Sequence, residues 1–559
     1  MKKCLFIFSL ILLPLQGFAQ GATTAGLDAA ASDISRMREE SFLGQKDAQI
    51  RAARESYLNN KAKIVKAKDA LSEEEKKQAD AKVLPIHKIF FAPSTALPAD
   101  FFNKLKAQYE GRVLSVNDIY DILDTVNNAY LLKGYIAARA YLPEQDVSKG
   151  VLVISLMEGR VQHFTISNNK HTKESYIKRY IDFCPCDAIA AGTLQQGALE
   201  FNAANDAKAR LTLAPGTVYG TTNVNVVMEE PPTFSLVGFM DNAGQRETGL
   251  LRYGAYATAR SLTQERDILS VGGMMSKGTH SAFASYEIPE PFFNSRVGFA
   301  FDYSDTEIVN GNLKPLNITG DFYGYSLYVK KPFFVRVNTI SNARFTASTK
   351  DGANYIDKNK TQSNDIDTLS LALDNVFMFS RGYLFNMVSA TKGLTLIDGD
   401  NYFWRGNYYG EAQYNLSKFF GLNLKVKGQK RLGGEVPTSE QMQIGGVNTV
   451  RGYSEGMLSA DSAIDGMAEF QYNMTFMKKI KPVDYVQAFA FFDYGHIFPS
   501  NDIYYPAGYE KDIYSAGGGL RMGLWKHFEG SLSVARRLRA HTYLDKEDTK
   551  ILFYVQAKI

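Results

Sequence analysis

Two short segments in the last quarter of the chain combine an arginine with a carboxylate that could receive it. The first reads VRGY and the second F-x-D-x-G, and their residues are Val450, Arg451, Gly452, Tyr453, Phe491, Asp493 and Gly495. An arginine presents five donors in a planar fork, and a carboxylate is its best bidentate acceptor. On a strand, alternation places the phenylalanine, the aspartate and the glycine on one face, where the ring can lend a π face to a guanidinium. Taken alone, the arginine could equally be an ordinary exposed loop residue.

The segment around Ser454 matches the G-x-S-x-G nucleophile elbow of α/β hydrolases, from Gly452 to Gly456. That motif works only where a strand turns sharply into a helix. Here it overlaps VRGY in a region rich in strand-forming residues, with no helical pattern after it. We therefore expect no catalytic residue in this chain and no enzymatic activity.

Two cysteines, Cys184 and Cys186, flank a single proline. The C-x-C spacing has no second cysteine pair and no suitably placed histidine, so a metal site is not expected. The seven histidines are scattered and form no zinc-ligand pattern. A strained local disulfide is the expected state in an oxidising compartment, with two unlinked thiols as the alternative. We expect neither a metal nor another cofactor.

Composition limits the class of protein. The 559 residues are 45% hydrophobic and 13% aromatic, and 63 basic residues face 59 acidic ones. This balance gives no reason to expect nucleic acid as a partner. The abundance of Tyr, Phe and Gly suits strands and turns rather than helical bundles.

The first residues predict export from the cytoplasm. Residues 1–19 combine two lysines, an apolar run and a small-residue cleavage site, which is typical of a secretory signal peptide. Past residue 20 no apolar run is long enough for a transmembrane helix. The exported chain is then either soluble outside the cytoplasm or a β-barrel of an outer membrane.

The remaining chain divides into four parts by composition and periodicity. Residues 20–82 are rich in Ala and charged residues and favour a helix that is polar on all sides, which requires water, a wet cavity or a linker role. Residues 83–159 predict a small α+β unit of order β-α-α-β-β, and residues 160–230 repeat that order. Such tandem units usually hold a partner. In residues 231–559 apolar and polar residues alternate between Gly- and Asn-rich turns, which allows about 16 strands of a transmembrane barrel.

Four motifs occur in order along this frame. Residues 134–160 read GYIAARAYLPEQDVSKGVLVISLMEGR, and three later segments read IGGVNTVRGY (444–453), FFDYG (491–495) and SAGGGLR (515–521). Together they resemble the TpsB transporters of two-partner secretion, which share a superfamily with the barrel-assembly insertases. The resemblance covers about residues 26–559. The chain departs from the family at its end, where Ile559 replaces the usual terminal Phe.

The resemblance implies a mainly β fold: a 16-stranded outer-membrane barrel behind two periplasmic polypeptide-transport-associated (POTRA) domains and an N-terminal helix that plugs the lumen. It places VRGY in a long extracellular loop that folds back into the lumen and makes Asp493 the wall partner of Arg451. The implied activity is export of one large exoprotein that bears a two-partner secretion domain, without nucleotide hydrolysis. Further implied partners are outer-membrane lipid and, during biogenesis, the barrel-assembly machinery and periplasmic chaperones. The alternatives are an insertase of other barrels, a passive porin and, more remotely, a hydrolase built on Ser454.

Overall fold

The computed structural model describes residues 83–133, 135, 138–158, 160–181, 191–218, 221–363, 365–395, 401–498, 510–539 and 548–559. The predicted signal peptide (1–19), the predicted plug segment (20–82), Cys184 and Cys186 lie outside the described residues. The described chain divides into two compact units that meet in sequence between Pro231 and Pro232. No helix in the described ranges is both long and apolar enough to cross a bilayer.

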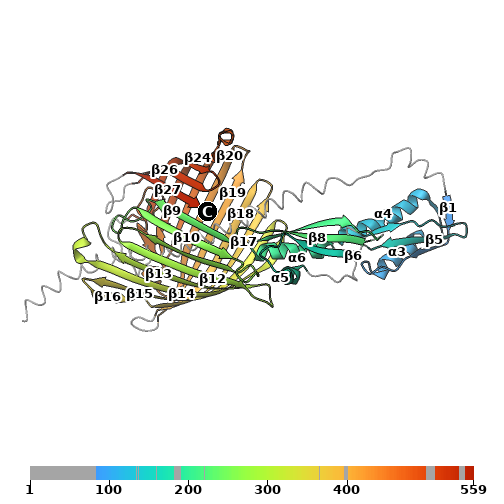
Figure 1. The fold of residues 1–559 in the computed structure, drawn as a ribbon, viewed down its shortest axis with the longest axis horizontal. Coiled ribbons are helices and arrows are strands. Elements are labelled where there is room, and N and C mark those ends of the chain that lie inside the picture. The colour runs from blue at the N-terminus through green and yellow to red at the C-terminus, as the bar shows by residue number, and fades with distance from the viewer. Residues whose placement is uncertain are drawn as a thin grey trace, which may run out of the picture. The chain divides into compact units, whose positions relative to one another are not determined.

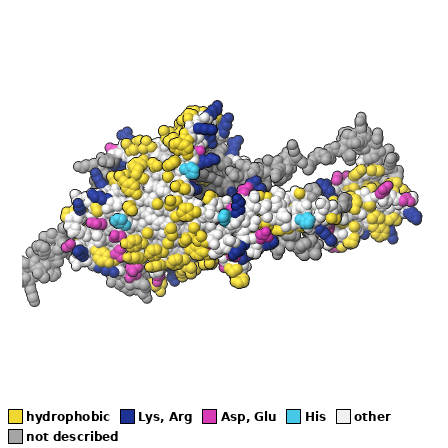
Figure 2. All heavy atoms as spheres, in the orientation of Figure 1, with side chains coloured by type: hydrophobic (Ala, Val, Ile, Leu, Met, Phe, Trp, Pro, Cys, Tyr) yellow, Lys and Arg dark blue, Asp and Glu magenta, His cyan; other side chains and the backbone are white. Residues whose placement is uncertain are grey.

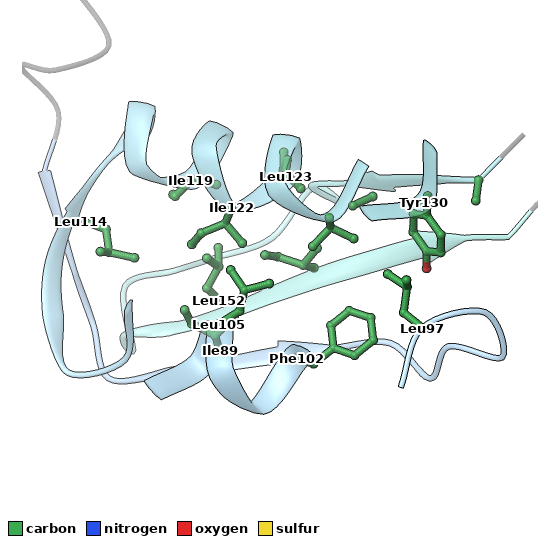
Figure 3. Packing of buried hydrophobic residues seen from close by; sticks show 14 of the residues in the cluster. Ile89, Leu97, Phe102, Leu105, Leu114, Ile119, Ile122, Leu123, Tyr130 and Leu152 are labelled. Carbon is green, nitrogen blue, oxygen red and sulfur yellow. The ribbon is translucent and has the colours of Figure 1, made fainter. Parts of the chain in front are cut away.

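The first α+β unit packs two helices against a three-stranded sheet. Its elements are β1 (Val83–Ile86), β2 (Lys88–Phe91), α3 (Ala99–Tyr109), β3 (Arg112–Ser115), α4 (Val116–Leu132), β4 (Arg139–Tyr141) and β5 (Val151–Met157). The sheet order is β2-β5-β4, with β2 parallel and β4 antiparallel to β5. Figure 3 shows how side chains of both helices meet those of β2 and β5 in one buried core. Helix α4 begins directly after Ser115, because Ser115 and Asp118 form a capping box.

The expected order β-α-α-β-β was incomplete for this unit. The first strand of that order is interrupted at His87, where the backbone N–H groups of His87 and Lys88 both bond to the carbonyl of Gly150, at 2.7 and 3.1 Å. The residues before this bend form β1, which pairs with β3 in a separate two-stranded sheet. Each of these strands is four residues long, so neither shows a recognisable alternation.

A half-buried carboxylate closes the loop before α3. Glu158 accepts hydrogen bonds from the Ser94 hydroxyl, from the Thr95 amide at 2.8 Å and hydroxyl at 2.6 Å, and from the Tyr130 hydroxyl at 2.9 Å. Burial by itself opposes ionisation, but these hydrogen bonds together hold the pKa of Glu158 below its usual value. The charged form of Glu158 is therefore the one that holds this loop.

The second α+β unit has the predicted order. Its elements are β6 (Arg160–Ser167), α5 (Glu174–Tyr180), α6 (Ala191–Ala204), β7 (Lys208–Pro215) and β8 (Thr221–Glu229). Strand β8 lies between β6 and β7, parallel to the first and antiparallel to the second. Three aromatic rings, from Tyr176, Tyr180 and Phe201, meet edge to face in its core.

The rest of the chain forms a closed antiparallel barrel (Figure 1). Its strands are β9 (Phe234–Asp241), β10 (Arg252–Arg260), β11 (Ile268–Met275), β12 (Thr279–Pro289), β13 (Arg296–Glu307), β14 (Ile318–Arg336), β15 (Thr339–Ile356), β16 (Asn359–Ser363), β17 (Ile366–Phe379), β18 (Gly382–Thr395), β19 (Asn401–Asn415), β20 (Phe420–Gly433), β23 (Ala463–Asn473), β24 (Val483–Ile497), β25 (Asp512–Leu524), β26 (Phe528–Arg537) and β27 (Thr549–Lys558). Strands β16 and β17 pair with successive parts of β15, with a register shift between Asn354 and Tyr355, and count as a single strand. The predicted 16-stranded barrel is confirmed.

The barrel closes between its last and first strands. Strand β27 pairs with β9 from Tyr554 opposite Asp241 to Lys558 opposite Val237. The terminal Ile559 extends this ladder, since its amide and carbonyl both bond to Leu236, at 2.9 and 3.0 Å. Closure therefore does not require an aromatic residue at the last position.

The two faces of the barrel wall differ as the alternation predicted. On β14 the side chain of Leu327 is 55% exposed on the outside, whereas that of Ser326 is 8% exposed on the inside. Figure 2 shows hydrophobic side chains spread over the outer surface of the barrel strands. An apolar exterior around a polar lumen is the arrangement that a lipid bilayer requires of a barrel.

Candidate functional site

A long segment between β20 and β23 turns into the barrel instead of ending in a simple loop. We call residues 434–462 the fold-back loop; it contains a 3-10 turn (Thr438–Glu440) and a hairpin of β21 (Met442–Ile444) and β22 (Leu458–Ala460). Its apolar side chains pack with Ile497 and Ile513 of the barrel wall in one buried cluster. The loop is therefore a packed part of the barrel interior.

Gly495 provides the space into which the fold-back loop packs. A Cβ atom at this position would lie 2.4 Å from Cγ2 of Ile444 and 3.0 Å from Cγ2 of Val450. Any side chain here would displace the loop from the wall. Gly495 thus stands next to both the hairpin and the VRGY segment.

Arg451 reaches from the tip of the loop to Asp493 on β24. Its Nε and Nη2 donate to the two carboxylate oxygens, each at 2.8 Å, and its backbone N–H donates to Oδ2 at 3.1 Å. Both side chains are buried, and Asp493 has no exposed surface. The guanidinium carbon also lies 3.5 Å from the centroid of the Phe491 ring. The structure therefore brings the two sequence motifs together in a fork-to-carboxylate pair.

Tyr453 fixes the loop to the wall a second time. Its hydroxyl donates to the carbonyls of Tyr514 at 3.2 Å and Arg539 at 2.8 Å. Gly452 between the two anchoring side chains has φ +94°, a conformation that favours glycine. Val450 is fully buried in the apolar cluster. All four VRGY residues therefore contribute to one docked conformation.

The ionic cluster is larger than the sequence motifs indicated. Glu469 on β23 accepts from Arg451 Nη1 at 3.3 Å and from both terminal nitrogens of Arg521, at 2.5 and 2.8 Å. The Arg521 guanidinium lies 4.0 Å from the Phe489 ring, which repeats the stacking of Arg451 on Phe491. Arg521 ends the SAGGGLR segment, which was the one available signal for this extension.

A second anchor, which sequence reasoning missed, holds the base of the fold-back loop. The side chain of Glu440 is 1% exposed and pairs with Lys350 of β15 and with Arg405 of β19, the latter at 2.5 Å. The three residues are far apart in sequence, and none belongs to a recognisable motif. Only the closed barrel brings them together, so no sequence signal could have found them.

Ser454 does not stand in the surroundings of a catalytic serine. It lies in the fold-back loop, is followed by β22 rather than a helix, and its hydroxyl accepts a hydrogen bond from Lys550 Nζ at 3.1 Å. Within the described ranges no group of three or more His, Cys, Asp or Glu side chains is arranged to hold a metal ion.

Comparison with known proteins identifies the family. Residues 220–522 match the family model of the haemolysin secretion/activation proteins ShlB/FhaC/HecB, and residues 84–159 match the ShlB-type POTRA domain. The chain belongs to this family. The prediction of a TpsB transporter is therefore confirmed, as is its place in the outer membrane with POTRA domains in the periplasm.

Similar proteins span most of the chain. The heme/hemopexin transporter protein HuxB of Haemophilus influenzae is 25% identical over 461 residues, covering 77% of this chain and 79% of the relative. The outer membrane transporter CdiB of Dickeya dadantii is 23% identical over 514 residues, 88% of each chain. The solved structure of CdiB from Escherichia coli shares the fold with a TM-score of 0.74 at 18% identity, over 95% of this chain and 98% of that one.

Proposed function

We propose that this transporter exports one large cognate exoprotein, bearing a two-partner secretion domain, through its barrel to the cell surface. The observation that carries the proposal is the fold-back loop, held in the lumen by the pair of Arg451 and Asp493 behind two α+β units. A passive porin needs neither of these features. The relatives HuxB and CdiB are themselves named as transporters, the first for heme and hemopexin. Neither name identifies the exoprotein of this chain.

The periplasmic units offer strand edges for capture of the exported chain. In the first unit β4 is an edge of the three-stranded sheet, and in the second unit β7 is an edge beside β8. An extended polypeptide can add to such an edge through backbone hydrogen bonds, with little demand on its side chains. This mode suits an unfolded exoprotein in transit.

In this proposal the fold-back loop is a positioning element of the pore rather than a catalytic one. Arg451 keeps it docked on the β24 wall, and the polar helix predicted in residues 20–82 occupies the lumen at rest. Folding of the exported chain outside the cell drives export, with no nucleotide hydrolysis and no enzymatic step. The cysteines 184 and 186 have a structural role only.

The deciding experiment compares secretion with and without this chain. Cells that lack the chain should retain the cognate exoprotein in the periplasm, and the wild-type gene should restore its release. An insertase would give another result, because folded, heat-modifiable forms of unrelated barrels would decline in the deletion strain. Normal release of every large exoprotein would refute the proposal.

A further inference from the structure

A hollow at one rim of the barrel has the lining of an anion site. It has a volume of about 460 Å³ and lies between the turn that joins β17 to β18, the turn that joins β19 to β20, and the end of β23. We call it the rim pocket, and its lining residues are Ser380, Arg381, Asn415, Leu416, Ser417, Lys418 and Asn473. Two of these are cations, four are neutral and polar, and no carboxylate is among them.

The rim pocket lies at the periplasmic end of the barrel. Strand β9 begins there, directly after the second periplasmic unit, and neighbouring strands run in alternating directions. The turns after β17, β19 and β23 are therefore at the same end as the first residue of β9. This end meets the headgroups of the periplasmic leaflet.

The cations around the pocket form no ion pair within the described part of the chain. The turn after β23 adjoins the pocket, because the amide of Asn473 bonds to the carbonyl of Phe419 at 2.7 Å. This turn adds three further lysines: Lys478, Lys479 and Lys481. Neither these lysines nor Arg381 and Lys418 form an ion pair with another described residue. Lys418 lies 4.8 Å from the centroid of the Phe419 ring. No described carboxylate pairs with any of the five cations, so their charge can attract an anionic ligand.

Exposed apolar groups accompany this charge. Leu416 lines the pocket, and in the neighbouring turn Phe476 is 57% exposed and Ile480 is 52% exposed. Apolar side chains next to cations at a membrane boundary match a molecule with an anionic head and acyl chains. A free phosphate would use only the polar part of this surface.

We propose that the rim pocket binds the phosphate of an anionic phospholipid, of the phosphatidylglycerol class, in the periplasmic leaflet. Arg381 and Lys418 contact the phosphate from two neighbouring turns. The Ser417 hydroxyl accepts from the amides of Phe419 and Phe420, each at 3.1 Å, and its own proton remains free to point into the pocket. The acyl chains lie along the outer wall. This lipid site is independent of the export proposed above.

The test measures lipid binding to the purified full-length protein by native mass spectrometry from detergent, with phosphatidylglycerol and phosphatidylcholine as probes. The wild type should retain phosphatidylglycerol in preference to phosphatidylcholine. Because each cation near an anionic headgroup contributes about fivefold to binding, the double variant R381Q/K418Q should bind it about 25-fold more weakly. The matched control K331Q/K526Q removes one cation from the periplasmic part of β14 and one from the turn after β25, and it should keep the preference. Folding of every variant is checked by heat-modifiable mobility.

Two further measurements keep the proposal falsifiable. Inorganic phosphate and glycerol phosphate at the same concentration should bind far more weakly than the lipid, and equal binding would mean that the pocket is a phosphate site without lipid selectivity. Equal retention of both lipids by the wild type would overturn the proposal without any variant. An equal loss of phosphatidylglycerol binding in the control variant would also overturn the proposal, since the charge of the whole rim would then explain the effect.

Discussion

The contact between Arg451 and Asp493 allows a quantitative test. In Arg451→Ala the two hydrogen bonds that the guanidinium donates to Asp493 disappear, and the buried Asp493 keeps only the bond from the backbone N–H of residue 451. Removing one partner of a buried ion pair costs about 3–5 kcal/mol, and the surviving bond places this case near the lower value. About 3 kcal/mol lowers the ratio of docked to undocked loop roughly a hundredfold. Export should therefore fall strongly. The barrel should still reach the membrane, because the hydrogen bonds between its strands are unchanged.

Removing the carboxylate instead of the guanidinium should lower the stability of the docked loop by a smaller amount. In Asp493→Ala the arginine retains Glu469 at 3.3 Å and the Phe491 ring at 3.5 Å, so about 2 kcal/mol is expected. The double variant leaves no unpaired buried aspartate and should be more stable than Arg451→Ala alone. All three variants should fail in export to a similar degree, because each lacks the same contact. Contact with water in the lumen would reduce these free-energy costs, but both side chains of the pair are buried.

The assay is exoprotein released per cell, normalised to the folded barrel, with the temperature of heat-induced unfolding as the stability measure. The matched control is Arg252→Ala. It breaks a second buried fork-to-carboxylate pair, to Asp241 at 2.8 and 3.0 Å, between the wall strands β9 and β10. The control should lose stability but keep export. Normal export in Arg451→Ala and Asp493→Ala, or defects that add in the double variant, would refute the role of the pair.

Three other outcomes can be measured in the same system. Glu440→Gln should reduce export without loss of folded barrel because Lys350 and Arg405 lose their carboxylate, whereas Glu287→Gln, which breaks a buried pair with an arginine of the wall, should not. Since the folded-state pKa of Glu158 is lowered, its contribution to stability is present above its unfolded-state pKa and lost as pH falls through the folded-state pKa. The urea midpoint of the periplasmic units, followed by far-ultraviolet circular dichroism, should therefore drop at acidic pH, and less so in Glu158→Gln. Deleting residues 26–60 should raise single-channel conductance in planar bilayers; unchanged conductance would place the predicted helix outside the pore.

Much of the fold followed from local patterns. Alternation of apolar and polar residues indicated the barrel strands because the lipid face and the lumen of a barrel impose a period of two. The start of α4 follows from its local sequence, because the capping box of Ser115 and Asp118 is a short-range effect that a few residues determine. The short strands β1 and β3 were missed, since four residues carry too little periodicity to be recognised.

The site divides in the same way. The sequence indicated the partners at the loop tip, because Arg451 and Asp493 each lie in a short motif, and the family resemblance that these motifs carry pairs the two residues. Only the tertiary structure determined the anchor at Glu440, the extension through Glu469 and the rim pocket. These side chains are of common types, and their role depends on which residues lie next to them in the folded barrel. Barrel closure brings residues from strands far apart in sequence into contact, and no local sequence pattern indicates such long-range contacts.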